Sequence, residues 1–290
     1  MPPEGEDAMT YWQDWSDEEM ERNFNPRVAA PDAADLLAGF VEKAAQARRN
    51  LDMRRNIAYG GHPREVYDVF PGIVGGPMHV FIHGGYWRAL SKDEHSFVAQ
   101  PLNGAGATVV LINYPLCPEV TLESLADSVM RGIAHAAKRA ADYGADPARV
   151  HLSGHSAGAH LSAIAAARDW TGDGLEADLI KSATLLSGVF DPAVAMRTTI
   201  NADIGLDDAQ ARRMNVLQAG FRPLPHVDVL LAAGGAEPDG WIRQSTDYRD
   251  MFDIEREVML PEGANHFTLL DHVTDPKDPL GRAMLALMDL

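Results

Sequence analysis

The stretch that decides the fold is RVHLSGHSAGAHL, residues 149–161. It begins as a short apolar strand, passes through a Gly-x-Ser-x-Gly turn, and continues without a linker into an alanine-rich run that favours a helix. A residue in a sharp strand-to-helix turn projects its side chain away from the sheet, and the chain turns this tightly only where the flanking positions lack a β-carbon. Gly154 and Gly158 fill those positions, so the pattern predicts Ser156 as a nucleophile.

The helix expected after Ser156 adds electrostatic support. Its unpaired amides and the positive end of its dipole point towards negative charge that develops above the serine. We therefore expect the amide of Ala157 to be an oxyanion donor. The plainer alternative is a serine that only caps an ordinary crossover helix.

A serine nucleophile needs a base and an acid that orients the base, and in this arrangement both follow the nucleophile on loops after late strands. The strand expected at 257–260 is followed by a Gly-containing loop that carries His266, which we expect to be the base. The strand expected at 229–233 is followed by a loop with two carboxylates. Glu237 is the expected acid because it lies nearer the strand end, and Asp239 is the alternative.

The segment FIHGGYW, residues 81–87, supplies the remaining donors. Two glycines at the end of a buried strand let backbone amides approach an oxyanion closely, so we expect Gly84 and Gly85 to join Ala157 in an oxyanion hole. The alternative is a plain Gly-Gly turn. His83 is expected to be structural. The residues expected to contact the substrate lie within the two motifs: Tyr86, Trp87 and His155.

The rest of the chain alternates between strand and helix patterns. Largely apolar runs at 78–82, 108–112 and 183–186 are typical of strands covered on both faces, and 122–137 has the period of an amphipathic helix. Residues 65–70 alternate and stop at Pro71, which predicts an edge strand. The pattern predicts an α/β fold with a mostly parallel, doubly wound sheet and helices on both faces, in one domain spanning 1–290.

Residues 1–50 form an acidic lead-in with three aromatic residues, Tyr11, Trp12 and Trp15, and a helical pattern after Pro31. Such a segment either folds over a pocket as a cap or simply packs on the domain, and the sequence leaves both alternatives open.

Composition excludes several classes of partner. A formal net charge of −17 disfavours nucleic acid and anionic membranes, and an anionic substrate would need a local arginine or lysine.

A single cysteine, Cys117, excludes an intrachain disulfide, and no signal peptide or membrane span is evident, so we expect a cytoplasmic protein. We expect no cofactor and no metal site, since His151 and His155 lie roughly 13 Å apart on a strand. Whether the chain forms homo-oligomers stays open.

Taken together, the His83-Gly84-Gly85-Tyr86-Trp87 and Gly154-x-Ser156-x-Gly158 segments resemble the kynurenine formamidase (arylformamidase) branch of the α/β-hydrolase fold, near the hormone-sensitive-lipase-like esterases. The similarity extends to NYPLCPE at 113–119, SGVFD at 187–191, RQS at 243–245 and NHF at 265–267. The resemblance implies a Ser156, Glu237, His266 triad, with a departure at Glu237, where this family usually has aspartate. It also implies hydrolysis of an N-acyl arylamine, typically N-formyl-L-kynurenine, through an acyl-serine.

Two other functions remain in competition. The first is a carboxylesterase that acts on small acyl esters. The second is a catalytically inactive α/β-hydrolase scaffold used for binding; such scaffolds usually lack a triad member, whereas all three positions are filled here.

Overall fold

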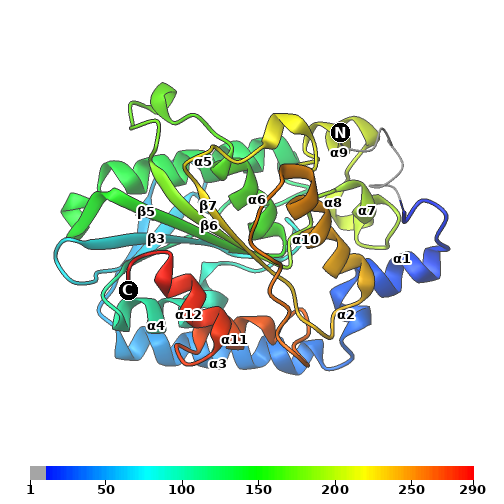
Figure 1. Ribbon diagram of the computed structural model, residues 1–290, viewed down its shortest axis with the longest axis horizontal. Helices are drawn as coiled ribbons and strands as arrows, with labels where there is room; N and C mark the ends of the chain where they lie inside the picture. Colours follow the sequence, from blue (N-terminus) through cyan, green and yellow to red (C-terminus); the bar gives the residue numbers. More distant parts are fainter. Residues whose placement is uncertain (1–10) are drawn as a thin grey trace.

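A computed structural model describes residues 11–290 as a seven-stranded sheet with helices on both faces (Figure 1). The strand order is β1-β2-β4-β3-β5-β6-β7, and the five strands from β4 to β7 in this order are parallel to one another. The strands are β1 (Arg54–Ala58), β2 (Val66–Phe70), β3 (Gly76–Ile82), β4 (Thr108–Ile112), β5 (Ala145–His155), β6 (Ile180–Leu186) and β7 (Asp228–Ala232). The predicted fold class is confirmed.

The helices form two layers, with α5 and α6 on one face of the sheet and α3, α4, α11 and α12 on the other (Figure 1). The α-helices are α1 (Asp17–Phe24), α2 (Pro26–Ala29), α3 (Ala33–Asn50), α4 (Ala99–Gly104), α5 (Leu122–Lys138), α6 (Ala157–Ala166), α7 (Ala193–Met196), α8 (Asn201–Ile204), α9 (Asp208–Arg213), α10 (Asp239–Phe252), α11 (Leu269–Thr274) and α12 (Pro279–Ala286).

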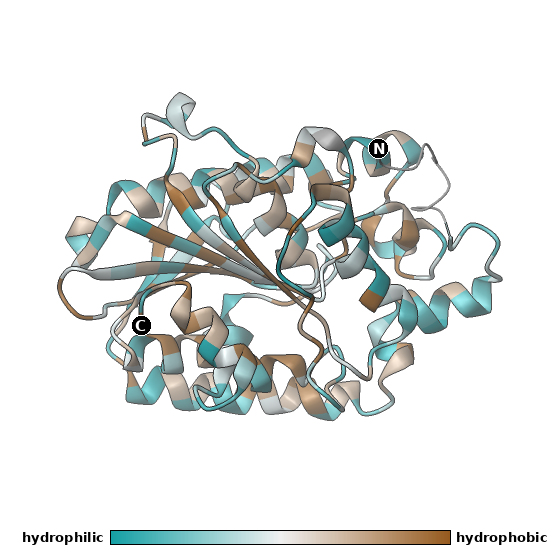
Figure 2. Ribbon diagram, in the orientation of Figure 1, coloured by the Kyte–Doolittle hydropathy of each residue, from teal (hydrophilic) through white to brown (hydrophobic). Residues whose placement is uncertain are grey.

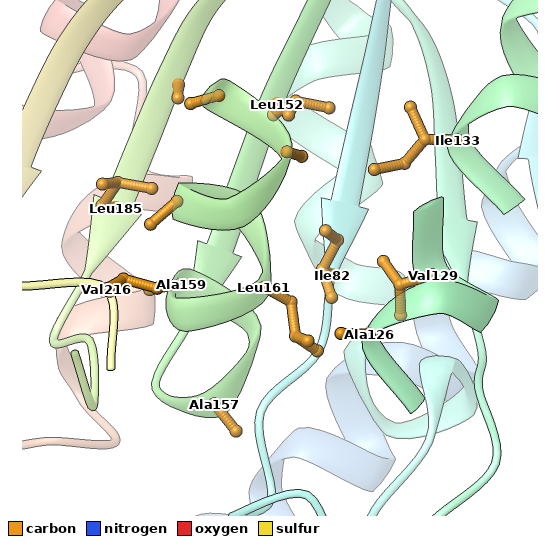
Figure 3. Close-up of a cluster of buried hydrophobic side chains, with 14 of the residues drawn as sticks. Ile82, Ala126, Val129, Ile133, Leu152, Ala157, Ala159, Leu161, Leu185 and Val216 are labelled. Atoms are coloured by element: carbon orange, nitrogen blue, oxygen red, sulfur yellow. The ribbon is translucent and has the colours of Figure 1, made fainter. Parts of the chain in front are cut away.

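Alternation along the central strands fills both layers of the core. Val80 and Ile82 of β3 face the cluster that includes α5 and α6, whereas Phe81 faces the cluster with α3, α4, α11 and α12. Figure 3 shows the first cluster, in which α6 lies over β5 and β6 with Leu161 directed towards α5. Colouring by hydropathy shows that apolar residues are concentrated in the strands, while α1 is mainly hydrophilic (Figure 2). These buried apolar runs explain why the parallel strands were recognisable from sequence.

Two strand predictions need correction. Strand β2 is not an edge strand, because β1 pairs with it on its outer side. The exposed, polar sequence of β1 carries no apolar alternation, so no pattern indicated this partner. The strand expected at 257–260 is reduced to a single bridge between Met259 and Ala232.

Within residues 11–290, no helix combines the length and apolar character that crossing a bilayer requires.

Candidate active site

Ser156 lies at the tip of the turn between β5 and α6, in a strained backbone conformation. Its φ of 56° and ψ of −120° fall outside the regions that residues other than glycine usually occupy. A β-carbon on Gly154 would lie 2.1 Å from the carbonyl oxygen of Gly158, and one on Gly158 would lie 2.0 Å from that of Ile82. The turn therefore requires glycine at both positions, for the steric reason expected from the sequence.

His266 and Glu237 meet above the carboxyl edge of the sheet. His266 Nδ1 lies 2.9 Å from Glu237 Oε2, and both side chains are buried. A carboxylate can only accept, so Nδ1 carries the proton in this contact and Nε2 is left as the basic nitrogen. Asp239 is exposed at the start of α10 and makes no such contact. The geometry thus favours Glu237 over Asp239 as the partner of the histidine.

Glu237 is held by two donors that the sequence reasoning missed. Its Oε1 accepts hydrogen bonds from Ser187 Oγ and from the backbone amide of Gly234, the latter at 2.6 Å. Ser187 follows β6 directly and has a φ of 45°. Its place at the end of a parallel strand, next to the strand that leads to Glu237, is the signal that would have identified it.

Ser156 and His266 line the same cavity, together with His155, Gly85 and Tyr86. Among the described residues, no hydrogen bond joins the Ser156 hydroxyl to His266. In unliganded enzymes this contact is often long or poorly aligned and tightens when the substrate binds. The structure therefore brings the candidate nucleophile and the candidate base to one cavity.

The glycine loop after β3 lies directly beside Ser156. A β-carbon on Gly84 would lie 2.8 Å from the carbonyl oxygen of His155 and 3.1 Å from Ser156 Cβ. Gly85 has a φ of 114°. In the part of the chain that the structure describes, the amides of Gly84, Gly85 and Ala157 donate to no main-chain acceptor. Free amides this close to a nucleophile suit an oxyanion.

His83 anchors that loop. Its Nδ1 lies 2.7 Å from the carbonyl oxygen of Gly84, and its ring stacks on Tyr114 with 4.2 Å between centroids. Tyr114 in turn donates a hydrogen bond of 2.6 Å to the carbonyl of His83. These contacts agree with the structural role expected for His83.

The three expected substrate contacts lie in different places. Tyr86 and His155 line the cavity, but Trp87 does not. Trp87 is fully buried and packs edge-on against His160, with 5.3 Å between ring centroids. Its position in the motif suggested a binding role, whereas the left-handed backbone at Tyr86 and Trp87 turns the larger ring into the core.

His155 has a second role that its position in the motif did not reveal. Its Nε2 donates to the backbone carbonyl of His266 at 2.8 Å. Burial, followed by the neighbouring charge of His266, lowers the pKa of His155 well below its usual value. His155 is therefore neutral near pH 7 and holds the His266 loop without placing a positive charge beside the base.

The lead-in supplies a wall of the cavity. Asn25, Pro26 and Arg27 from α1–α2 and Leu37 and Phe40 from α3 all line it. The cavity and its open mouth together hold about 560 Å³ of empty space, part of which is open to solvent. The other lining residues are Arg88, Ala89, Leu90, His95, Ile200 and Phe267.

The lead-in is fixed to α10, which follows Glu237. Phe24 is fully buried and lies 6.3 Å from Trp241 between ring centroids, and Trp241 lies 4.3 Å from the ring of His266. Asn23 also accepts a hydrogen bond from the amide of Gly240 at 3.1 Å. One chain of contacts thus runs from the lead-in to the candidate base.

No group of three or more potential ligands among histidine, cysteine, aspartate and glutamate is arranged for a metal ion within residues 11–290.

The chain is similar to hydrolases over nearly its whole length. The kynurenine formamidase of Salmo salar is 27% identical and aligns with 97% of this chain and 99% of its own. The isoprenylcysteine alpha-carbonyl methylesterase of Arabidopsis thaliana is 32% identical over 45% of this chain and 31% of its own. The resemblance to kynurenine formamidases that the motifs indicated is confirmed.

Solved structures and a family model agree with this relationship. A crystal structure from Silicibacter sp., proposed to be a thioesterase, superposes with a TM-score of 0.78 at 26% identity, covering 93% of this chain and all of that one. Residues 79–223, half of the chain, match the family model described as alpha/beta hydrolase fold. The chain therefore belongs to the alpha/beta hydrolase family.

Proposed function

We propose that this chain is a serine hydrolase that removes the formyl group from an N-formyl arylamine such as N-formyl-L-kynurenine. The observation that carries the proposal is the convergence of Ser156 and the Glu237–His266 pair on one cavity. Similarity to kynurenine formamidases over nearly the whole chain supports this substrate class. The expected partner is a small molecule, and the reaction needs no cofactor.

In the first half of the reaction, the Ser156 hydroxyl attacks the formyl carbon while Nε2 of His266 takes its proton. Glu237 stabilises the resulting imidazolium through Nδ1. The carbonyl electrons move onto oxygen, where the amides of Gly84, Gly85 and Ala157 stabilise the charge. His266 then returns its proton to the arylamine nitrogen as the C–N bond breaks, because an unprotonated arylamine is a poor leaving group.

In the second half, water attacks the formyl-serine with His266 as the base. The tetrahedral intermediate collapses to formate and regenerates the Ser156 hydroxyl. The apolar part of the cavity lining, which includes Leu37, Phe40 and Phe267, suits the aryl ring of the released amine.

Ester hydrolysis is the second candidate, because the plant methylesterase is 32% identical over the stretch that it shares with this chain. Parallel assays of kcat/KM on N-formyl-L-kynurenine and on 4-nitrophenyl acetate distinguish the two. We expect efficient turnover of the formamide. Negligible formamide turnover beside rapid ester turnover would overturn the proposal.

An inactive binding scaffold is the third candidate function. Covalent labelling by a serine-directed phosphonate tests it, since a scaffold would not be labelled at Ser156. A structure of the labelled protein would also show how the lead-in lies over the bound acyl group, and so test whether it is a cap within a single domain.

A further inference from the structure

The charges on the cavity wall contrast with those of the whole chain. The chain has 42 aspartate and glutamate residues against 25 lysine and arginine residues. Yet among the described residues that line the cavity, Arg27 and Arg88 are both present and no carboxylate is. The lining itself therefore contributes two guanidinium groups and no carboxylate, in a protein whose overall charge repels anions.

Besides Glu237, which pairs with His266, two carboxylates bond to residues that line the cavity, and both are already engaged. Asp203 of α8 pairs with Nη1 of Arg88 at 2.6 Å. Glu21 of α1 accepts from Asn25 Nδ2 at 2.9 Å and from the backbone amide of Thr199. Neither carboxylate lines the cavity. Neither provides a counter-ion for Arg27, which is exposed and forms no ion pair with any other described residue.

Arg88 keeps one edge of its guanidinium unused. Only Nη1 has a partner; Nε is buried and, within residues 11–290, has no hydrogen-bond acceptor. A planar guanidinium binds a carboxylate through two parallel N–H donors, and the edge formed by Nε and Nη2 has this geometry. A buried donor without an acceptor also costs free energy, which an incoming oxygen would relieve.

From these observations we infer that Arg88, assisted by Arg27, is a specificity-determining site for a carboxylate on the substrate. The inference rests on the proposed function and deepens it: it names the side chains that bind the carboxylate of a substrate such as N-formyl-L-kynurenine, with the aryl ring against the apolar lining. Because Nε is shielded from water, the side chains around Arg88 must adjust as the carboxylate binds.

The test compares two substrates of the same skeleton, N-formyl-L-kynurenine and its carboxamide, which lacks the carboxylate charge. The measured quantity is the preference, defined as kcat/KM for the acid divided by kcat/KM for the carboxamide. We expect Arg88→Met to lower the preference by roughly 10-fold to 100-fold, as for loss of a charge-assisted hydrogen bond. Arg27→Met, at an exposed position, should lower it by about 3-fold.

Two controls separate recognition from structure. Asp203→Asn breaks the ion pair with Arg88 but leaves the guanidinium, so the preference should hold or rise. Arg49→Met removes one exposed charge from α3 outside the cavity and should leave the preference unchanged. If Arg88→Met and Asp203→Asn lower turnover of both substrates equally, Arg88 is only a link between the glycine loop and α8, and the inference is wrong.

The outcome also separates this inference from the proposed function. If the wild-type protein hydrolyses neither formamide, the proposed function fails, and the preference is then measured on the hydrogen succinate and butyrate esters of 4-nitrophenol. A preference for the anionic ester that Arg88→Met abolishes would still support the carboxylate site. No preference on either pair would overturn it.

Discussion

The two walls of the cavity are built in different ways. The wall on the sheet side includes Ser156 and His155, at the carboxyl end of β5, and His266, on the loop that follows the Met259 bridge; all three side chains are buried. The opposite wall comes from α2 and α3 and includes the exposed Arg27 and the half-buried Leu37.

From this difference we expect the first wall to carry out the chemical step and the second wall to influence which substrate binds. On the sheet side, close backbone contacts allow few residue types, so the reacting groups are fixed by steric constraints. On the lead-in side, helices present side chains that can change without disturbing the sheet. We therefore expect substitution of Ser156 or His266 on the first wall to abolish turnover. Substitutions on the second wall should change stability and, at Arg27, substrate choice, to which Arg88 of the loop after β3 also contributes.

The largest effect is expected at the nucleophile. Replacing Ser156 with alanine should lower kcat by roughly 10⁶-fold, because the covalent step is lost, with little change in the circular dichroism spectrum or the melting temperature. Steady-state kinetics on N-formyl-L-kynurenine provides the measurement. Unchanged activity would refute the nucleophile assignment and the division between the walls.

The second-largest loss of kcat is expected at Glu237, the acid proposed for the triad. Glu237→Gln should lower kcat by roughly 10³-fold to 10⁴-fold, since an amide no longer fixes the tautomer of His266 or stabilises its cation. Asp239→Asn is the matched control at the exposed start of α10 and should have no effect. The reverse pattern would make Asp239 the acid.

Substitutions on the lead-in side should mainly change the free energy of unfolding. Phe24→Ala removes a fully buried ring next to Trp241 and should lower the free energy of unfolding by about 3 kcal/mol. Urea denaturation measures this loss. Val41→Ala, at a half-exposed position on α3, should cost less than about 0.5 kcal/mol. If Phe24→Ala abolished hydrolysis of 4-nitrophenyl acetate as completely as Ser156→Ala, the proposed separation would be wrong.

The smallest expected effect is a dependence of protein stability on pH that involves Asp247. Burial is the main cause that raises the pKa of Asp247, on α10, from 3.8 to about 6, and its Oδ2 is buried without a partner among the described residues. The folded state thus binds this proton more tightly than the unfolded chain does. The associated stability is present below pH 3.8 and is lost as the pH rises through about 6.

It follows that Asp247→Asn should stabilise the protein by roughly 1 to 2 kcal/mol at pH 8 and have almost no effect near pH 4. Thermal unfolding of both proteins across this range measures the difference. An equal gain at pH 4 and pH 8 would show that titration of Asp247 is not the cause.

Much of the sheet side was predictable from sequence because each constraint there leaves a local signal. Only glycine fits at positions 154 and 158, because an added β-carbon would lie less than 2.5 Å from a backbone oxygen. The parallel strands are continuous apolar runs. His266 could be selected because a histidine after a late strand reaches the same sheet edge.

The rest depends on contacts between distant segments, which leave no local signal. Strand β1 is polar and exposed, and only its pairing with β2 makes it a strand. The support that Ser187 gives to Glu237 joins residues 50 positions apart. The role proposed for Arg88 depends on Arg27, which lines the same cavity from a segment 61 positions away.

The cavity lining extends from Asn25 to Phe267, so nearly the whole length of the chain must be in place before the pocket exists. During synthesis, Ser156 leaves the ribosome more than one hundred residues before His266. A nascent chain of intermediate length therefore carries this hydroxyl without the base proposed for it. Hydrolytic activity should therefore arise only after Phe267 has been synthesised and has joined the cavity.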